Sequence, residues 1–276
     1  MSGGWKDYYQ CRMIEDRTWL IRDLYGDCSY LLEGEKYALL IDTGIGLPGF
    51  EEAVRQLTDK PVRVLLTHGH LDHIGGCGYW KEVMIHEKEI STLGRHQNVG
   101  YRQIIRGLTK EVGLKLKEKA IQNCIHIKIP REINFIKEKD DGQAIDLGGR
   151  RLIIMETPGH TEGSVCLWEP DRKALYSGDT ICENRVMLSF PESCSPACYG
   201  RSLKKLASIQ DKIQKIYAGH NKVPLPPAWI GHFMDCAAAL AGNRQMGSIE
   251  ETSSVFGKCQ IFKVGMAELT CHIEKE

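Results

Sequence analysis

Short apolar runs bounded by Gly, Pro or Asp recur along the chain and predict many short strands. One set of expected strands covers 19–21, 29–32, 37–41, 62–67 and 83–86. A second set covers 151–155, 164–168, 174–177 and 215–218, and a late pair is expected within 259–273. Runs of this kind are typical of strands that are buried on one or both faces. The pattern therefore indicates two strand-rich halves.

Apolar residues at helical spacing predict three helices between these strands. Phe50, Val54 and Leu57 mark one face of a helix that follows Pro48 and Gly49. The second expected helix has Ser202 as its N-cap and carries Leu203, Leu206, Ile209, Ile213 and Ile216 on one face. The third covers 228–241. The sequence predicts that 87–135 is a helical insert or lid between the two halves of a single domain, 1–276.

Composition and charge narrow the class of protein. The 276 residues are 42% hydrophobic and 26% charged, which is ordinary for a globular protein. Lys plus Arg and Asp plus Glu both number 36, so the net charge of 0 gives no argument for a nucleic-acid partner. No window approaches the about 20 apolar residues of a membrane span. We therefore expect neither a nucleic acid nor a membrane as partner.

The cysteines suggest the compartment. There are 11 of them, an odd number scattered along the chain without any Cys-x-x-Cys pair. The first residues also lack an apolar stretch behind a basic start. We therefore expect a reduced, cytoplasmic protein in which most thiols are small buried apolar groups.

The sequence that follows the strand 62–67 carries the candidate chemistry. His68-Gly69-His70-Leu71-Asp72-His73 places four metal-ligating side chains within six residues. On a loop between a strand and a helix, His68 and His70 can face one point while Asp72 and His73 turn toward a second. Imidazole nitrogen and carboxylate oxygen suit Zn²⁺ and other borderline divalent ions. The motif therefore predicts a metal site.

The His-x-His-x-Asp-His pattern resembles the signature of the metallo-β-lactamase-fold superfamily. Further motifs agree with that family in type and order: Leu40–Gly44 with Asp42, Thr157–Thr161 with His160, Ser177–Thr180 with Asp179, and Ala218-Gly219-His220. The resemblance implies an α+β fold, a four-layer αββα sandwich with the metal site built from loops at a sheet edge.

The resemblance also implies a ligand set for two divalent metal ions. His68, His70 and His160 would bind the first ion, Asp72, His73 and His220 the second, and Asp179 would bridge both. The ions are expected to be Zn²⁺, with Mn²⁺ and Fe²⁺ left open. Asp42 would stand behind the ligands, where a carboxylate fixes the tautomer of a histidine.

The implied activity is hydrolysis by a hydroxide bound at the dinuclear centre, with Asp72 able to orient it or to pass a proton onward. The substrate is expected to be a small molecule with an ester-like bond, and thioester, lactone and phosphoester all stay open. A di-iron redox protein and a nucleic-acid phosphodiesterase are the alternatives. His70 stands where the di-iron branch carries Glu, and the neutral charge disfavours the phosphodiesterase.

Four residues are candidate substrate contacts. Residues 101–140 hold ten Lys and Arg against five acids, so an anionic substrate could meet Arg102 and Arg106 there; a solvated helical face explains the same charges. Cys182 lies close to Asp179 in the sequence, and His86 ends a predicted strand. Aromatic residues near the N-terminus, such as Trp5 and Tyr8, can line a pocket, form the interface of a homo-oligomer or belong to the core.

Overall fold

The computed structural model of the chain describes residues 4–97, 101–111, 127–242, 248–254 and 257–271. The chain divides into two compact units. The first comprises Met1–Lys137 and Ile145–Arg151, and the second comprises Glu138–Ala144 and Leu152–Glu276. Each unit has its own hydrophobic core.

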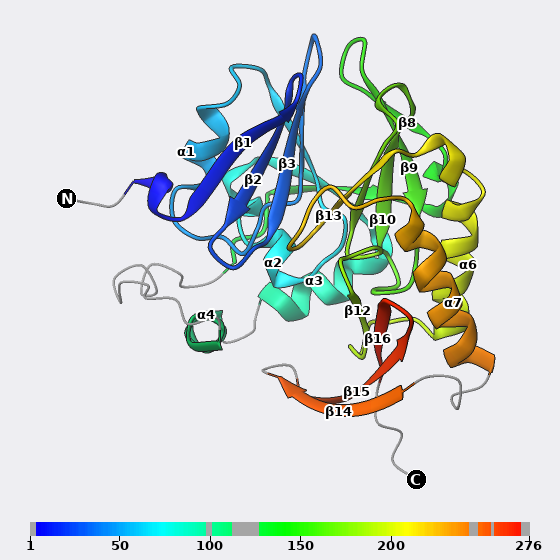
Figure 1. Cartoon of the computed structure of the whole chain (residues 1–276). Coiled ribbons are helices and arrows are strands. Elements are labelled where there is room, and N and C mark those ends of the chain that lie inside the picture. Colours follow the sequence, from blue (N-terminus) through cyan, green and yellow to red (C-terminus); the bar gives the residue numbers. More distant parts are fainter. Residues whose placement is uncertain (1–3, 98–100, 112–126, 243–247, 255–256, 272–276) are drawn as a thin grey trace. The chain divides into compact units, whose positions relative to one another are not determined.

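A seven-stranded mixed sheet forms the centre of the first unit (Figure 1). The sheet follows chain order: β1 (Tyr9–Glu15), β2 (Thr18–Asp23), β3 (Cys28–Glu33), β4 (Ala38–Ile41), β5 (Val62–Leu65), β6 (Glu82–His86) and β7 (Glu132–Ile136). The strands from β1 to β4 are antiparallel, and those from β4 to β7 are parallel. The carboxyl ends of β4, β5 and β6 therefore meet at one edge, where the functional loops begin.

Helices and short 3₁₀ turns complete the first unit: η1 (Trp5–Asp7), α1 (Phe50–Arg55), α2 (Leu71–Ile74), η2 (Cys77–Tyr79), η3 (Glu87–Glu89), α3 (Ile90–Gln97) and α4 (Tyr101–Glu111). The core is built from strand residues such as Leu40 and Val64, against which Phe50 of α1 and Ile105 of α4 pack. Burial of these apolar side chains is the main stabilising contribution. It holds β4 and β5 rigidly beneath the loops that follow them.

The second unit contains two sheets. One has five strands in the order β13 (Lys215–Ala218), β11 (Ala174–Gly178), β10 (Val165–Glu169), β9 (Arg151–Glu156) and β8 (Ala144–Asp146). The other runs in the order β12 (Arg185–Leu188), β16 (Ala267–Cys271), β15 (Gly257–Val264) and β14 (Ser248–Ser254). The division between the units falls at β8 (Ala144–Asp146) and the start of β9.

Two helices, α6 (Pro196–Ala207) and α7 (Ala228–Gly242), lie side by side in the second unit (Figure 1). Tyr199 of α6 and Phe233 of α7 are fully buried in one core with Leu175, Ile216 and Phe262 of the strands. Three 3₁₀ turns connect the elements: η4 (Glu138–Asp140), η5 (Pro170–Arg172) and η6 (Gln210–Lys212).

The α+β class expected from the sequence is confirmed, and the strands predicted from apolar runs are present. Among the residues that the structure describes, five strands were not predicted: β1, β7, β8, β12 and β14. The prediction of a single domain with an insert at 87–135 stays a prediction. Within that insert α3 and α4 are helical, residues 132–136 form β7, and residues 112–126 lie outside the described residues. None of the helices in the described part of the chain has the length and apolar character needed to cross a membrane.

The second predicted helix was placed wrongly. It begins at Pro196, and the Ser195 side chain caps it by accepting the Cys198 N–H at 3.3 Å. A Ser N-cap followed by Pro at the first helical position is a strong start signal. Ser202 is therefore an interior residue of α6, and Ile216 belongs to β13. The apolar spacing continued past the true end of the helix because both elements face the same core.

Candidate metal centre

The loop between β5 and α2 carries three of the predicted histidines. His68, His70 and His73 are all buried, with exposed fractions of 1%, 4% and 1%. The ring centroid of His68 lies 4.7 Å from that of His70 and 4.0 Å from that of His73. Asp72 is more open, and its Oδ2 lies 4.0 Å from His73 Nε2. The structure therefore brings the four ligands predicted in this loop together within the first unit.

Asp42 supports this loop from the end of the neighbouring parallel strand β4. It is 2% exposed, and its carboxylate accepts the Thr67 N–H at 2.7 Å and the Thr67 hydroxyl at 2.8 Å. Its Oδ2 also lies 2.8 Å from His73 Nδ1. A carboxylate only accepts, so His73 Nδ1 carries the proton and its Nε2 is the nitrogen suited to a metal.

The other side of the loop is held by η3 and α3. Glu89 Oε2 accepts the Gly69 N–H at 2.8 Å, and His96 Nδ1 accepts the Leu71 N–H at 3.2 Å. The rings of His96 and His70 have centroids 4.7 Å apart at an interplanar angle of 32°. Neither residue was among the candidates from the sequence. Glu89 belongs to η3 and His96 to α3, and no local pattern in the sequence marks them as supports of this loop.

His160, Asp179 and His220 come together within the second unit. Asp179 directly follows β11 and His220 follows β13 by one residue, and these two strands are parallel, so both side chains emerge at one sheet edge. Asp179 Oδ2 lies 3.2 Å from His220 Nε2 and 3.5 Å from His160 Nε2. His160 Nδ1 donates to the Met187 carbonyl at 2.7 Å, which leaves Nε2 as the nitrogen that faces Asp179.

Helix α6 and the residues just before it fix the backbone around His160. The Ser202 hydroxyl donates to the Pro158 carbonyl at 2.7 Å, and the Ser193 hydroxyl donates to the His160 carbonyl at 2.8 Å. Gly159 packs so closely against Tyr199 that an added Cβ would lie 2.3 Å from Tyr199 Cδ2. A side chain at position 159 is therefore excluded, and the loop sits directly on α6.

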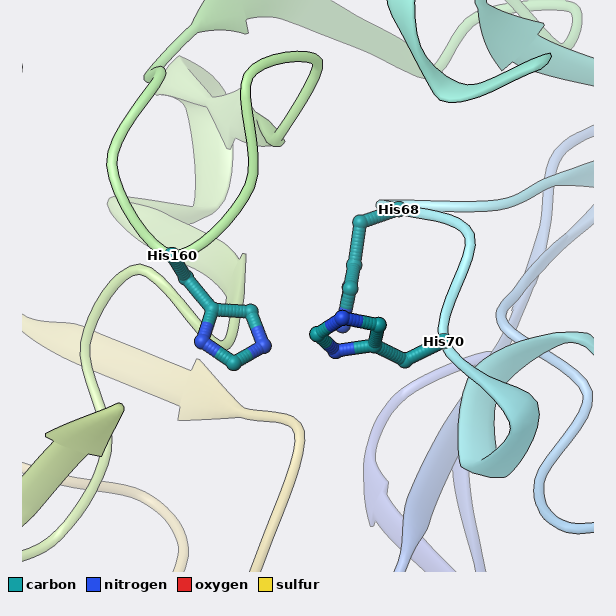
Figure 2. A group of neighbouring side chains, drawn as sticks. All are labelled: His68, His70 and His160. Carbon is teal, nitrogen blue, oxygen red and sulfur yellow. The ribbon is translucent and has the colours of Figure 1, made fainter. Parts of the chain in front are cut away.

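Figure 2 shows His68 and His70 on the loop that follows β5, and His160 on the loop that follows β9. The seven predicted ligands thus fall into two sets, one in each unit. Within each set the imidazole and carboxylate donors point toward one another, which is the donor chemistry of a divalent metal site. His73 Nδ1 is hydrogen-bonded to Asp42 and His160 Nδ1 to the Met187 carbonyl, and metal-binding histidines normally have such a hydrogen bond on their second ring nitrogen.

The candidate substrate contacts lie in different surroundings. Cys182 is 5% exposed, and its Sγ lies 3.8 Å from Asp179 Oδ1. His86 is buried, and its Nδ1 accepts the Lys88 N–H at 3.2 Å as the cap of η3. Arg106 is exposed on α4, and the side chain of Arg102 lies outside the described residues. The roles predicted for these four stay predictions.

Two buried thiols of the molecule are unsuited to nucleophilic chemistry. Burial raises the pKa of Cys166 to about 11 and the pKa of Cys77 to about 12. Only the thiolate is a nucleophile, and near neutral pH such thiols are protonated. They behave as small apolar residues, as the sequence predicted for most cysteines.

The chain belongs to the metallo-beta-lactamase superfamily, whose family model matches residues 28–220. It is 28% identical over 239 residues to Acyl-coenzyme A thioesterase MBLAC2 of Homo sapiens, covering 78% of this chain and 81% of that protein. It is 26% identical over 198 residues to Hydroxyacylglutathione hydrolase GloC of Haemophilus influenzae, covering 70% of this chain and 84% of that protein.

The fold comparison agrees with the family. A solved metallo-beta-lactamase from Pontibacter korlensis matches with a TM-score of 0.58 at 17% identity, over 83% of this chain and 98% of that one. The metallo-β-lactamase fold and the class of metallo-hydrolase predicted from the sequence are confirmed. Membership of the family implies divalent metal binding.

Proposed function

We propose that the protein is a dinuclear, zinc-dependent thioester hydrolase. In this proposal His68, His70 and His160 would hold one ion, Asp72, His73 and His220 would hold the second, and Asp179 would contribute to both. Support comes from the two converging donor sets and from relatives whose names specify a thioesterase and a hydroxyacylglutathione hydrolase. An acyl group on coenzyme A and one on the thiol of glutathione are both thioesters, so this bond is preferred over lactone and phosphoester.

The observation that carries the proposal is the control of histidine tautomers in both units. The Asp42 carboxylate holds His73 Nδ1 at 2.8 Å, and the Met187 carbonyl holds His160 Nδ1 at 2.7 Å. Both contacts leave Nε2 as the ligating nitrogen and fix the plane of the ring. In both units the other ring nitrogen, Nε2, also has a carboxylate beside it. Asp72 Oδ2 lies 4.0 Å from His73 Nε2, and Asp179 Oδ2 lies 3.5 Å from His160 Nε2. Purely structural histidines do not need this combination twice.

When bound, a pair of divalent ions would lower the pKa of water toward neutrality and polarise the substrate carbonyl. The residues of the chain then have separate tasks. Asp72 is the one acid among the four ligands proposed in the first unit, and 29% of its side chain is exposed. In this proposal it orients the attacking water and accepts its proton. The departing thiol has a low enough pKa to leave as a thiolate, so no side chain has to protonate it.

The test is a substrate panel run on the protein purified without chelator. Acyl-coenzyme A and acyl-glutathione esters are assayed by release of free thiol, beside a lactone and a p-nitrophenyl phosphodiester, with D72A and H68A as controls. We expect thioester turnover that both variants lose, and about two zinc ions per chain by elemental analysis.

Preferred turnover of the phosphodiester or the lactone would contradict the thioester proposal. Iron with a redox-active spectrum would contradict the zinc hydrolase and favour the di-iron alternative.

A further inference from the structure

The segment from β6 to α3 forms hydrogen bonds on both sides of His70. Glu89 accepts the N–H of Gly69, the residue before His70, at 2.8 Å. His96 accepts the N–H of Leu71, the residue after it, at 3.2 Å. We name Glu89 and His96 the His70 clamp. The clamp binds the backbone of the loop and leaves its imidazoles available as donors.

Glu89 is fully buried, with an exposed fraction of 0%. Burying a carboxyl group is costly unless it is hydrogen-bonded, so its position needs a compensating role. The contact with the loop is also tight. A Cβ added at Gly69 would lie 3.0 Å from Glu89 Oε2 and 3.0 Å from the Leu93 nitrogen. The loop is therefore seated directly on η3 and α3, and Glu89 fixes its height above them.

His96 adds a second constraint through its ring. Its Nδ1 acts as an acceptor and so carries no proton, which makes Nε2 the N–H of a neutral imidazole. The ring lies over that of His70, with centroids 4.7 Å apart and planes inclined by 32°. This contact limits the rotation of the His70 ring, while the hydrogen bond to Leu71 fixes the start of α2.

We propose that Glu89 and His96 are positioning residues that aim the His70 imidazole at its metal ion. The inference rests on the proposed function in one respect, the assignment of His70 as a ligand. Outer contacts of this kind typically change metal affinity by about 10-fold to 100-fold when they are removed. Both residues accept backbone N–H groups of the loop, so they can change zinc affinity without being metal ligands themselves.

The experiment compares variants that keep the hydrogen-bond acceptor with variants that remove it. E89Q and H96N keep an oxygen acceptor near the original position, whereas E89A and H96F remove it, and H96F retains an aromatic ring. The full chain is loaded with Zn²⁺ for chelator competition and with Co²⁺ for its electronic absorption spectrum. Neither readout depends on knowing the substrate.

Two matched controls separate positioning from general stability. Glu169 is buried, with an exposed fraction of 1%, and its carboxylate lies 3.3 Å from the Arg172 guanidinium. It pairs with Ala174 at the start of β11, and Asp179 follows the other end of that strand. His232 lies on α7 with its ring 5.6 Å from that of Trp229. E169A and H232F should lower the melting temperature without changing zinc affinity or the cobalt spectrum.

We expect E89A and H96F to weaken zinc binding by about 10-fold or more and to alter the cobalt spectrum, with E89Q and H96N closer to wild type. Wild-type affinity and spectrum in both E89A and H96F would overturn the inference while leaving the proposed function intact. A chain that binds no metal would overturn both. If H96F bound zinc more tightly than H96N, ring packing and not the hydrogen bond would be what matters at position 96, which would contradict the clamp. If E89A fails to fold, the two His96 variants decide the question.

Discussion

At the scale of single residues, Asp42 is the side chain that links the end of β4 to the histidine loop after β5. It has a left-handed φ of 59° at the end of β4, a conformation that Asp tolerates better than most residues. From there it accepts hydrogen bonds from Thr67 and holds His73 Nδ1. The motif in the sequence identified Asp42 as a supporting residue, and the structure shows which atoms it supports.

Replacing Asp42 with Asn should weaken metal binding more than it weakens folding. The amide has one acceptor oxygen in place of two, so it cannot serve both Thr67 and His73 as the carboxylate does. We expect D42N to lower zinc affinity by about 10-fold to 100-fold, measured by chelator competition. D146N is the control, because Asp146 accepts only a turn N–H, that of Gly148 at 2.8 Å, on the surface. Equal affinities in D42N and D146N would contradict the role of Asp42.

A second residue-scale prediction concerns Asp23, a carboxyl group outside the ligand sets. Burial raises its pKa, and the neighbouring charge of Asp27 raises it further. The unfolded chain titrates near the ordinary value of about 3.9. The contribution of Asp23 to stability is therefore complete below that pH and is lost as the pH rises through the raised pKa of the folded state.

D23N should remove this dependence, because the Asn amide does not ionise in this pH range. We expect the stability of the wild type relative to D23N to fall from about pH 4 upward, measured by urea denaturation in chelator. D171N, at an exposed acid, is the matched control. A constant difference between wild type and D23N across this range would contradict the prediction.

At the scale of elements, much of the fold was predictable because the chemistry of each run is local. Apolar runs bounded by Gly or Pro predicted nine strands and the late pair, because a buried strand can be recognised from its own residues without knowing which strand it pairs with. Exposed or alternating strands such as β1, whose Met13 is 58% exposed, lack that signal. The end of α6 was missed because β13 continues the same apolar spacing.

The candidate site divides in the same way. The family motifs predicted a ligand set and Asp42 because those residue types carry the chemistry themselves, and the assignment of the ligands stays a prediction. Glu89 and His96 were missed because their role depends on η3 and α3 packing against a loop about twenty positions earlier in the chain, a tertiary contact that no local pattern encodes.

The contact between α6 and the His160 loop yields a prediction for a pair of glycines. In G159A the new methyl group would lie 2.3 Å from Tyr199 Cδ2. Tyr199 is fully buried and donates to the Thr180 carbonyl at 2.7 Å, so it cannot move aside. We expect G159A to cost about 1–3 kcal/mol in the free energy of unfolding and to weaken zinc binding through His160.

The matched control is G200A in the same helix. Its Cβ would meet only Ala237 Cβ at 4.0 Å, and Ala is preferred over Gly inside a helix by about 1 kcal/mol. G200A should therefore be neutral or stabilising and retain full zinc affinity. Urea denaturation and chelator competition measure both variants. A G159A protein as stable as G200A would show that the loop can lift away from α6.

At the scale of the whole molecule, the proposed ligand sets belong to different units of the chain. His68, His70, Asp72 and His73 lie in the first unit, and His160, Asp179 and His220 lie in the second. A ligand that binds only the folded state stabilises it by about 2.7 kcal/mol when present at 100 times its dissociation constant. Ions shared by both sets would therefore stabilise the units as one.

Removing the metal should accordingly lower the melting temperature of the whole chain, and added zinc should restore it. The informative comparison is between H70A and H160A, which each remove one ligand from one unit only. If the ions need both sets, each substitution alone should abolish most of the zinc-dependent rise in melting temperature, while H232F should retain all of it. A full zinc response in H160A would mean that the first unit binds the ions by itself, and the shared centre would have to be abandoned.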